Sequence, residues 1–105
     1  MSDPELDELK REFLAEAQEK VAEIETTLGR ERTPQSLERL IYLAHQLKGS
    51  GGSYGFQRIS SESAELEKVL EAVKSGESEP AEIVRQHVAN IRSEIERGLR
   101  ELTPA

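Results

Sequence analysis

Apolar residues recur at intervals of three and four along most of this chain, a spacing typical of amphipathic helices. Short segments rich in glycine, proline and charged residues separate four such stripes. No stretch alternates apolar and polar residues over several positions, so we predict no β-strands. Because four helices with short connections fold most simply as an antiparallel up-down four-helix bundle, the pattern predicts an all-α fold.

The first helix is predicted from Pro4 to the glycine at position 29. Ser2 or Asp3 can cap it, and Glu5 completes a possible capping box with Ser2. Gly29 ends this helix in the usual C-terminal role of glycine. Its apolar stripe consists of Leu6, Leu9, Phe13, Ala17, Val21, Ile24 and Leu28.

The second helix opens at Thr33-Pro34. It should end near Gly52 to Tyr54, because several glycines weaken its last turns. We interpret Gly51 as a sign that the helix frays toward this end. The apolar stripe of the second helix consists of Leu37, Leu40, Ile41, Ala44 and Leu47.

Two further helices complete the predicted bundle. The third is closed by Ser75-Gly76, and the segment 77–80 forms a turn before the fourth. Gly98 lets a neighbouring helix come close, and Pro104 stops the fourth helix before a frayed tail. The third stripe is Phe56, Ile59, Ser63, Leu66, Leu70 and Val73; the fourth is Val84, Val88, Ile91, Ile95, Leu99 and Leu102.

Length and composition restrict the function. We expect the 105 residues to form one domain, 1–105, and the absence of cysteine excludes disulfides and thiolate metal sites. A net charge of -7 argues against binding to nucleic acid, which relies on lysine and arginine. No apolar run approaches the roughly 20 residues of a membrane span, and the acidic N-terminus is unlike a signal peptide. We therefore expect a cytoplasmic protein without a membrane partner.

His45 is the main candidate for chemistry. It follows Ala44 on the second helix, so it is turned roughly 100° from the apolar stripe. Gly49 and Gly52 lie four and seven residues later, on the same side as His45. Each glycine costs about 1 kcal/mol relative to alanine in a helix interior, which indicates that another molecule approaches here. A neutral imidazole, with a reference pKa of about 6.5, is a suitable nucleophile near neutral pH.

The motif His45-x-Leu47-Lys48-Gly49-Ser50, with Gly55 ten residues after the histidine, resembles the signature of histidine-containing phosphotransfer domains. These include the N-terminal phosphotransfer domain of chemotaxis-type histidine kinases. The resemblance implies a phosphocarrier in a His–Asp phosphorelay, with His45 as phosphoacceptor and no cofactor of its own. It also implies two partners: a response-regulator receiver domain that carries its own Mg²⁺, and a sensor or hybrid histidine kinase.

The resemblance also implies roles for residues around the histidine. In chemotaxis-type relatives, a glutamate 22 residues after the histidine accepts a hydrogen bond from the ring nitrogen that is not phosphorylated; here this is Glu67. Glu67 could equally be a solvated residue among the other acidic side chains of the third helix, and the residues alone leave this open. Lys48, one turn after His45, is expected to offer its ammonium to the phosphoryl oxygens.

A small, flat apolar patch around the histidine is expected to bind the partner. It consists of Tyr42, Gly49 and Gly52, with Phe56 added if the chain stays helical that far. Such a patch with a charged rim is the composition expected for the centre of a transient interface.

The same residues also bear on other possible functions. His87 has no motif around it and is expected to be a structural or partly exposed histidine. The glycine-rich segment lacks the strand that a P-loop or dinucleotide loop requires, and there is no room for a nucleotide-binding catalytic domain, so we expect no kinase activity. A helical adaptor without chemistry stays open as an alternative. A metal-binding bundle does not fit, because neither histidine has a glutamate three residues before it.

Overall fold

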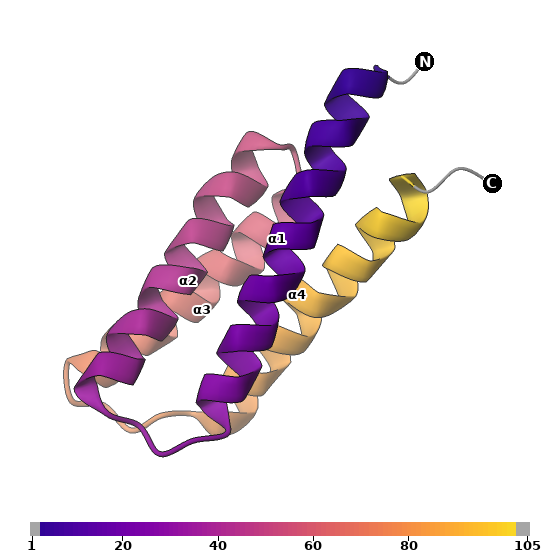
Figure 1. Cartoon of the computed structure of the whole chain (residues 1–105). Coiled ribbons are helices and arrows are strands. Elements are labelled where there is room, and N and C mark those ends of the chain that lie inside the picture. Colours follow the sequence, from indigo (N-terminus) through magenta and orange to yellow (C-terminus); the bar gives the residue numbers. More distant parts are fainter. Residues whose placement is uncertain (1–2, 103–105) are drawn as a thin grey trace.

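The structure is a computed structural model that describes residues 3–102. Over this range the chain forms four α-helices and no strand, which confirms the predicted all-α class. The helices pack side by side as a bundle, in which each contacts two neighbours (Figure 1). They are α1 (Pro4–Leu28), α2 (Pro34–Ser53), α3 (Gln57–Lys74) and α4 (Ala81–Leu102).

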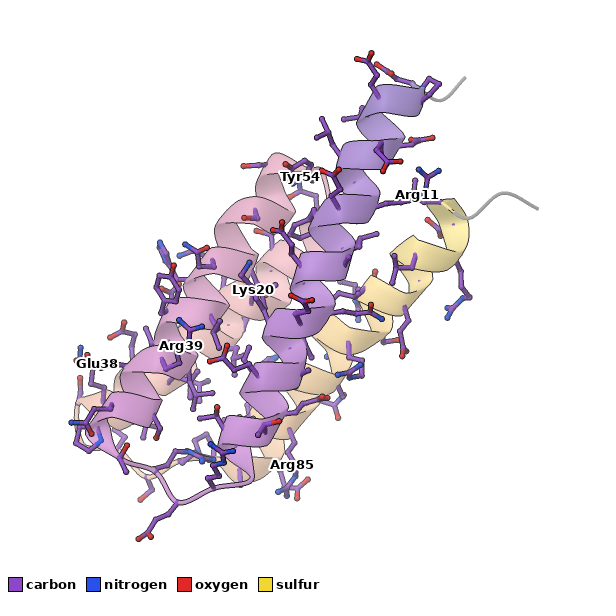
Figure 2. The ribbon with its side chains drawn as sticks, viewed as in Figure 1. Arg11, Lys20, Glu38, Arg39, Tyr54 and Arg85 are labelled. Atoms are coloured by element: carbon purple, nitrogen blue, oxygen red, sulfur yellow. The ribbon has the colours of Figure 1, made fainter. Side chains whose placement is uncertain are left out.

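The connections between the helices lie at the two ends of the bundle. The α1–α2 and α3–α4 connections lie at one end, and the α2–α3 connection lies at the other (Figure 1). The end with the α2–α3 connection is also where α1 begins and α4 finishes. There the Arg11 guanidinium donates hydrogen bonds to the Leu102 carbonyl, joining α1 to the last turn of α4 (Figure 2).

The starts of α1 and α2 are fixed by side-chain caps of the predicted kind, whereas the start of α3 at Phe56 has no side-chain cap. Asp3 Oδ1 accepts hydrogen bonds from the backbone N–H groups of Glu5 and Leu6, at 2.9 and 3.4 Å. At α2, Thr33 Oγ1 accepts from the Ser36 N–H, and Ser36 Oγ accepts from the Thr33 N–H, so the two form a capping box. The alternative cap, Ser2, and the predicted stop at Pro104 lie outside the described residues.

The end of α1 is stabilised differently from the prediction. Gly29 follows the helix, but its φ of -78° is right-handed, so the left-handed freedom of glycine is not used. Instead, the Arg32 guanidinium donates to the carbonyls of Thr27 and Leu28 in the last turn of the helix. The same guanidinium holds Glu79 with two bonds of 2.8 and 3.0 Å, tying the α1–α2 connection to the residues before α4.

A continuous hydrophobic core runs between the helices and includes most of the predicted stripe residues. At Gly98 an added Cβ would lie 3.0 Å from Leu14 Cδ1, so this glycine lets α1 approach α4, as predicted. The buried apolar residues are Phe13, Leu14, Ala17, Val21, Ile24, Leu37, Leu40, Leu43, Ala44, Leu47, Ile59, Leu66, Leu70, Val84, Val88, Ile91 and Ile95.

The beginning of the α1 stripe departs from this pattern. Leu6 and Leu9 are 43% and 46% exposed, whereas Phe13 is buried. The first turns of α1 extend past the ends of the neighbouring helices, so no helix covers these two leucines (Figure 1). The core therefore begins at Phe13. None of the four described helices is both long enough and apolar enough to cross a membrane.

Candidate functional site

His45 lies on the surface of α2 and contacts Glu67 of α3. Its side chain is 60% exposed, whereas the neighbouring Ala44 is buried. The ring Nδ1 lies 2.9 Å from Oε2 of Glu67, which projects from α3. The imidazole is thus held at one nitrogen and open to solvent over most of its surface.

Glu67 joins two side chains of α2. Its Oε1 accepts a hydrogen bond of 2.7 Å from Lys48 Nζ, while its Oε2 contacts His45. The Glu67 side chain is only 16% exposed, so both contacts form in a partly desolvated environment. Of the acidic residues on α3, Glu67 is therefore the one that the bundle brings to His45.

The charge on Glu67 determines the tautomer of the histidine. The hydrogen bond from Lys48 lowers the pKa of Glu67 most, and the contact with His45 lowers it further, against an opposing effect of burial. Glu67 is therefore ionised at neutral pH and can only accept hydrogen bonds. The proton of the neutral imidazole must then lie on Nδ1, which leaves the lone pair on Nε2.

The glycines after His45 occupy three different environments. A Cβ added at Gly49 would meet nothing within 4 Å, so the surface one turn after the histidine is open. At Gly52 a Cβ would lie 3.4 Å from Ser60 Oγ, so this position faces α3 rather than free solvent. At Gly51 it would lie 3.1 Å from the Ser60 backbone nitrogen.

The environment of Gly51 corrects its interpretation as a fraying residue. Gly51 is buried within α2, which continues to Ser53, inside the predicted range for the helix end. Its carbonyl accepts a hydrogen bond of 2.8 Å from the Phe56 N–H. Glycine suits this position because the backbone of α3 passes so close that an added Cβ would push it away by a few tenths of an ångström.

The chain turns sharply between the second and third helices. Gly55 has a φ of +82°, a left-handed conformation that favours glycine. Because the helix ends before this turn, Phe56 does not continue the α2 surface. Its ring is partly buried and stacks on Phe13 of α1, with a centroid distance of 5.6 Å. Tyr54 stacks on the same ring at 5.2 Å and lies at this end of the bundle (Figure 2).

Tyr42 lies one turn before His45 and is 50% exposed. The Arg39 guanidinium sits over its ring, 5.4 Å from the centroid. Two hydrogen bonds of 2.6 and 2.9 Å join Arg39 to Glu23 of α1. The Tyr42 ring therefore has one face against a charged pair that links α2 to α1, and the rest of it is open.

A second histidine–carboxylate pair lies on the other side of α3. His87 Nδ1 is 2.7 Å from Glu62 Oε2, and Glu62 Oε1 accepts from Asn90 Nδ2 at 3.1 Å. The His87 side chain is only 21% exposed. The sequence carries no signal for this pairing, because its partners are far apart in the chain and belong to no motif.

Other features of the surface lie apart from His45. A hollow of about 810 Å³ between α1 and α4 is lined by apolar residues, including Leu28, Val84 and Val88, and by ion pairs, and contains no residue of the His45 site. Among residues 3–102, no three His, Cys, Asp or Glu side chains are grouped so that they could hold a metal ion.

The sequence model of one family, described as Hpt domain, matches residues 8–102. The chemotaxis protein CheA of Rhizobium meliloti (strain 1021) is 29% identical over 80 residues, which are 72% of this chain and 11% of that protein. This chain thus spans about a ninth of the length of that relative. No solved structure matches it.

Proposed function

This chain belongs to the Hpt domain family, and from this premise we propose that it is a phosphocarrier that accepts and donates a phosphoryl group on His45. Hpt domains take part in histidine phosphotransfer with kinases and response regulators. The observation that carries the assignment to His45 is its contact with Glu67. This contact leaves the lone pair on Nε2 of an exposed ring.

The transfer step follows from the charges at the site. Nε2 of neutral His45 attacks the phosphorus of an aspartyl phosphate on the receiver domain. The N–P bond forms as the bond between phosphorus and the aspartate oxygen breaks, and the aspartate leaves as a carboxylate. The ring then carries a positive charge with its proton on Nδ1, and the Glu67 carboxylate stabilises this cation. Donation to a receiver is the reverse of this step.

We propose that the Lys48 ammonium binds the phosphoryl oxygens. Its ammonium lies on Glu67 in the unphosphorylated protein, and its side chain is partly exposed, so it can turn toward a phosphoryl group on the neighbouring ring. The Mg²⁺ required for transfer belongs to the receiver, in keeping with the resemblance to phosphotransfer domains.

The receiver docks, in this proposal, on the outer surface of α2. Tyr42 and Gly49 supply the exposed part of this surface, on either side of His45 along the helix. Gly52 and Phe56 are half-buried and can contribute only at its edge, beside α3 and the bundle end. An up-down bundle with antiparallel neighbours presents this surface free of other helices, consistent with the placement of the connections in Figure 1.

The similarity to CheA supports a narrower form of the same proposal. In that form the chain is the phosphotransfer domain of a chemotaxis-type histidine kinase and receives its phosphoryl group from a separate kinase catalytic domain. A helical adaptor that binds receivers without chemistry is the competing function. It predicts receiver binding that does not depend on an intact imidazole.

The test is incubation of the purified chain with a panel of phosphorylated receiver domains, followed by assay for acid-labile phosphate on this chain. We expect acceptance by the wild type and by His87→Gln, and none by folded His45→Gln. His87 is a matched control, because it is the second histidine and also has a glutamate at Nδ1. Transfer that survives His45→Gln, or receiver binding without any transfer to the wild type, would contradict the proposal.

A further inference from the structure

We propose that Ser60 is a positioning residue for the His45 site, an inference that rests on the proposed function for its effect on transfer but not for its effect on geometry. The Ser60 hydroxyl donates a hydrogen bond of 2.8 Å to the backbone carbonyl of Lys48. This bond joins the first turns of α3 to the α2 residue that holds Glu67. Neither a sequence motif nor the transfer chemistry accounts for it.

Ser60 and Glu67 lie on the same face of α3. They are seven residues apart, which is two helical turns, so both point toward α2. On α2 the corresponding contacts are the Lys48 carbonyl for Ser60, and His45 with the Lys48 ammonium for Glu67. A shift of α3 along or about its axis at Ser60 therefore moves the Glu67 carboxylate relative to the imidazole.

Directional contacts are needed to fix the position of α3 relative to α2. The apolar contacts of Leu66 and Leu70 with the core favour burial but are not directional, and they tolerate small sliding movements. The hydrogen bond from half-buried Ser60 has a preferred length and angle. It therefore fixes the register of the two helices at the end of the contact nearest the α2–α3 turn.

Gly51 makes this hydrogen bond possible. An alanine Cβ at position 51 would lie 3.1 Å from the Ser60 nitrogen and 3.2 Å from Ile59 Cγ2, both closer than ordinary contacts. Because one of these atoms belongs to the backbone, α3 would have to move away from α2. The glycine and the serine thus act together to bring Glu67 into reach of His45.

The experiment compares Ser60→Ala with Ser61→Ala. Ser61 is the next residue on α3, but it is exposed and its hydroxyl donates to the Arg58 carbonyl of its own helix, so it is a matched control. The readout is the fraction of neutral His45 with its proton on Nδ1, measured by ¹⁵N NMR of the ring. A second readout is the rate of phosphoryl acceptance from a phosphorylated receiver, with circular dichroism to verify folding.

We expect Ser60→Ala to lower the Nδ1-protonated fraction and to slow acceptance about fivefold, as the loss of one hydrogen bond predicts. Ser61→Ala should leave both unchanged. Gly51→Ala keeps the hydroxyl but separates the helices, so it should change the tautomer in the same direction as Ser60→Ala.

A wild-type tautomer in folded Ser60→Ala, or an equal change in Ser61→Ala, would overturn the positioning role. The tautomer is measured without any phosphodonor. Absence of transfer in the wild type would therefore refute the phosphocarrier proposal and leave the NMR result to decide on Ser60.

Discussion

Glu62 and Glu67 lie five residues apart on α3, and each places a carboxylate oxygen within 2.9 Å of the Nδ1 of one histidine. Five residues correspond to a rotation of roughly 140° about the helix axis, so the two carboxylates reach opposite neighbours. Glu67 contacts His45 on α2, and Glu62 contacts His87 on α4. Both contacts are possible because α3 packs against α2 and against α4.

The two pairs differ in what surrounds the histidine. Beside His45, the second carboxylate oxygen holds the ammonium of Lys48; beside His87, it holds the neutral amide of Asn90. The side chains of the two histidines are 60% and 21% exposed. The two pairs therefore share the histidine–carboxylate contact but differ in the exposure of the ring and in the presence of a nearby cation.

Replacing Glu67 by glutamine should weaken the acid dependence of stability. Its pKa is lowered in the folded protein, first by Lys48 and then by His45, so its contribution to stability is present above the unfolded value of about 4.5. This contribution is lost as the pH falls through the lower folded value. The free energy of unfolding, from urea denaturation, should thus fall less between about pH 5 and roughly pH 3 in Glu67→Gln than in the wild type.

Glu65→Gln is the control for this experiment, since Glu65 is exposed on the same helix and forms an exposed ion pair with Lys68, at 3.6 Å. An equal fall in stability for Glu67→Gln and wild type would show that the contacts of Glu67 do not contribute to folding.

Lys48→Ala should slow phosphoryl transfer without abolishing it. A partly solvated ammonium contributes about 1 to 2 kcal/mol to a developing charge, which corresponds to roughly a 5- to 30-fold slower rate. Single-turnover transfer at low and high salt measures this effect. Lys68→Ala, which removes an exposed lysine from α3, should transfer normally. A Lys48→Ala rate equal to that of the wild type at both salt concentrations would show that Lys48 does not contribute to transfer.

Leucine at Gly49 and at Gly51 should have opposite effects on stability. At Gly49 the side chain has open space, so the gain in helix propensity, of about 1 kcal/mol or less, should raise the thermal midpoint. At Gly51 it collides with the backbone of α3 and should lower the midpoint. Despite its greater stability, Gly49→Leu should obstruct the receiver and slow transfer. Normal transfer by Gly49→Leu would mean that docking does not need this open surface.

Ser63→Ala should stabilise the protein. The Ser63 Oγ is fully buried and has no hydrogen-bond partner among the described residues. Removing an unsatisfied hydroxyl, with the higher helix propensity of alanine, should raise the free energy of unfolding by about 1 kcal/mol. Ser61→Ala, on the exposed face, reports the propensity effect together with the loss of one exposed hydrogen bond, of 3.3 Å, to the Arg58 carbonyl. A loss of stability in Ser63→Ala would show that the hydroxyl has a bonded partner, such as an internal water molecule.

Much of the fold was predictable, because the signals that determine it are local. The three- and four-residue spacing of apolar residues places all four helices. Thr33 before a proline marks the start of α2 because a capping hydroxyl and the helix it caps are adjacent in sequence. The resemblance around His45 then singled out Glu67, which periodicity alone could not distinguish from the other acids of α3.

What could not be predicted depends on how helices meet. Leu6 and Leu9 continue the α1 stripe in sequence, but their exposure is decided by where the neighbouring helices end. Gly51 resembles a helix breaker until the backbone of α3 is placed beside it. Ser60 lacks a signal for the same reason, since its partner is a backbone carbonyl twelve residues earlier on another helix.

The location of the site on α2 and α3 has a consequence for how such a protein can change. The histidine, its carboxylate, its lysine and the serine proposed to set their register all belong to one helical hairpin. Helices α1 and α4 supply burial and surface charge to this hairpin, whereas the side chains that we propose for the reaction, His45, Lys48 and Glu67, lie on α2 and α3. Substitutions on their outer faces can therefore alter solubility, net charge or the choice of partner while the reaction stays the same. The side chains proposed for the reaction and the outer faces of α1 and α4 can therefore change independently of each other.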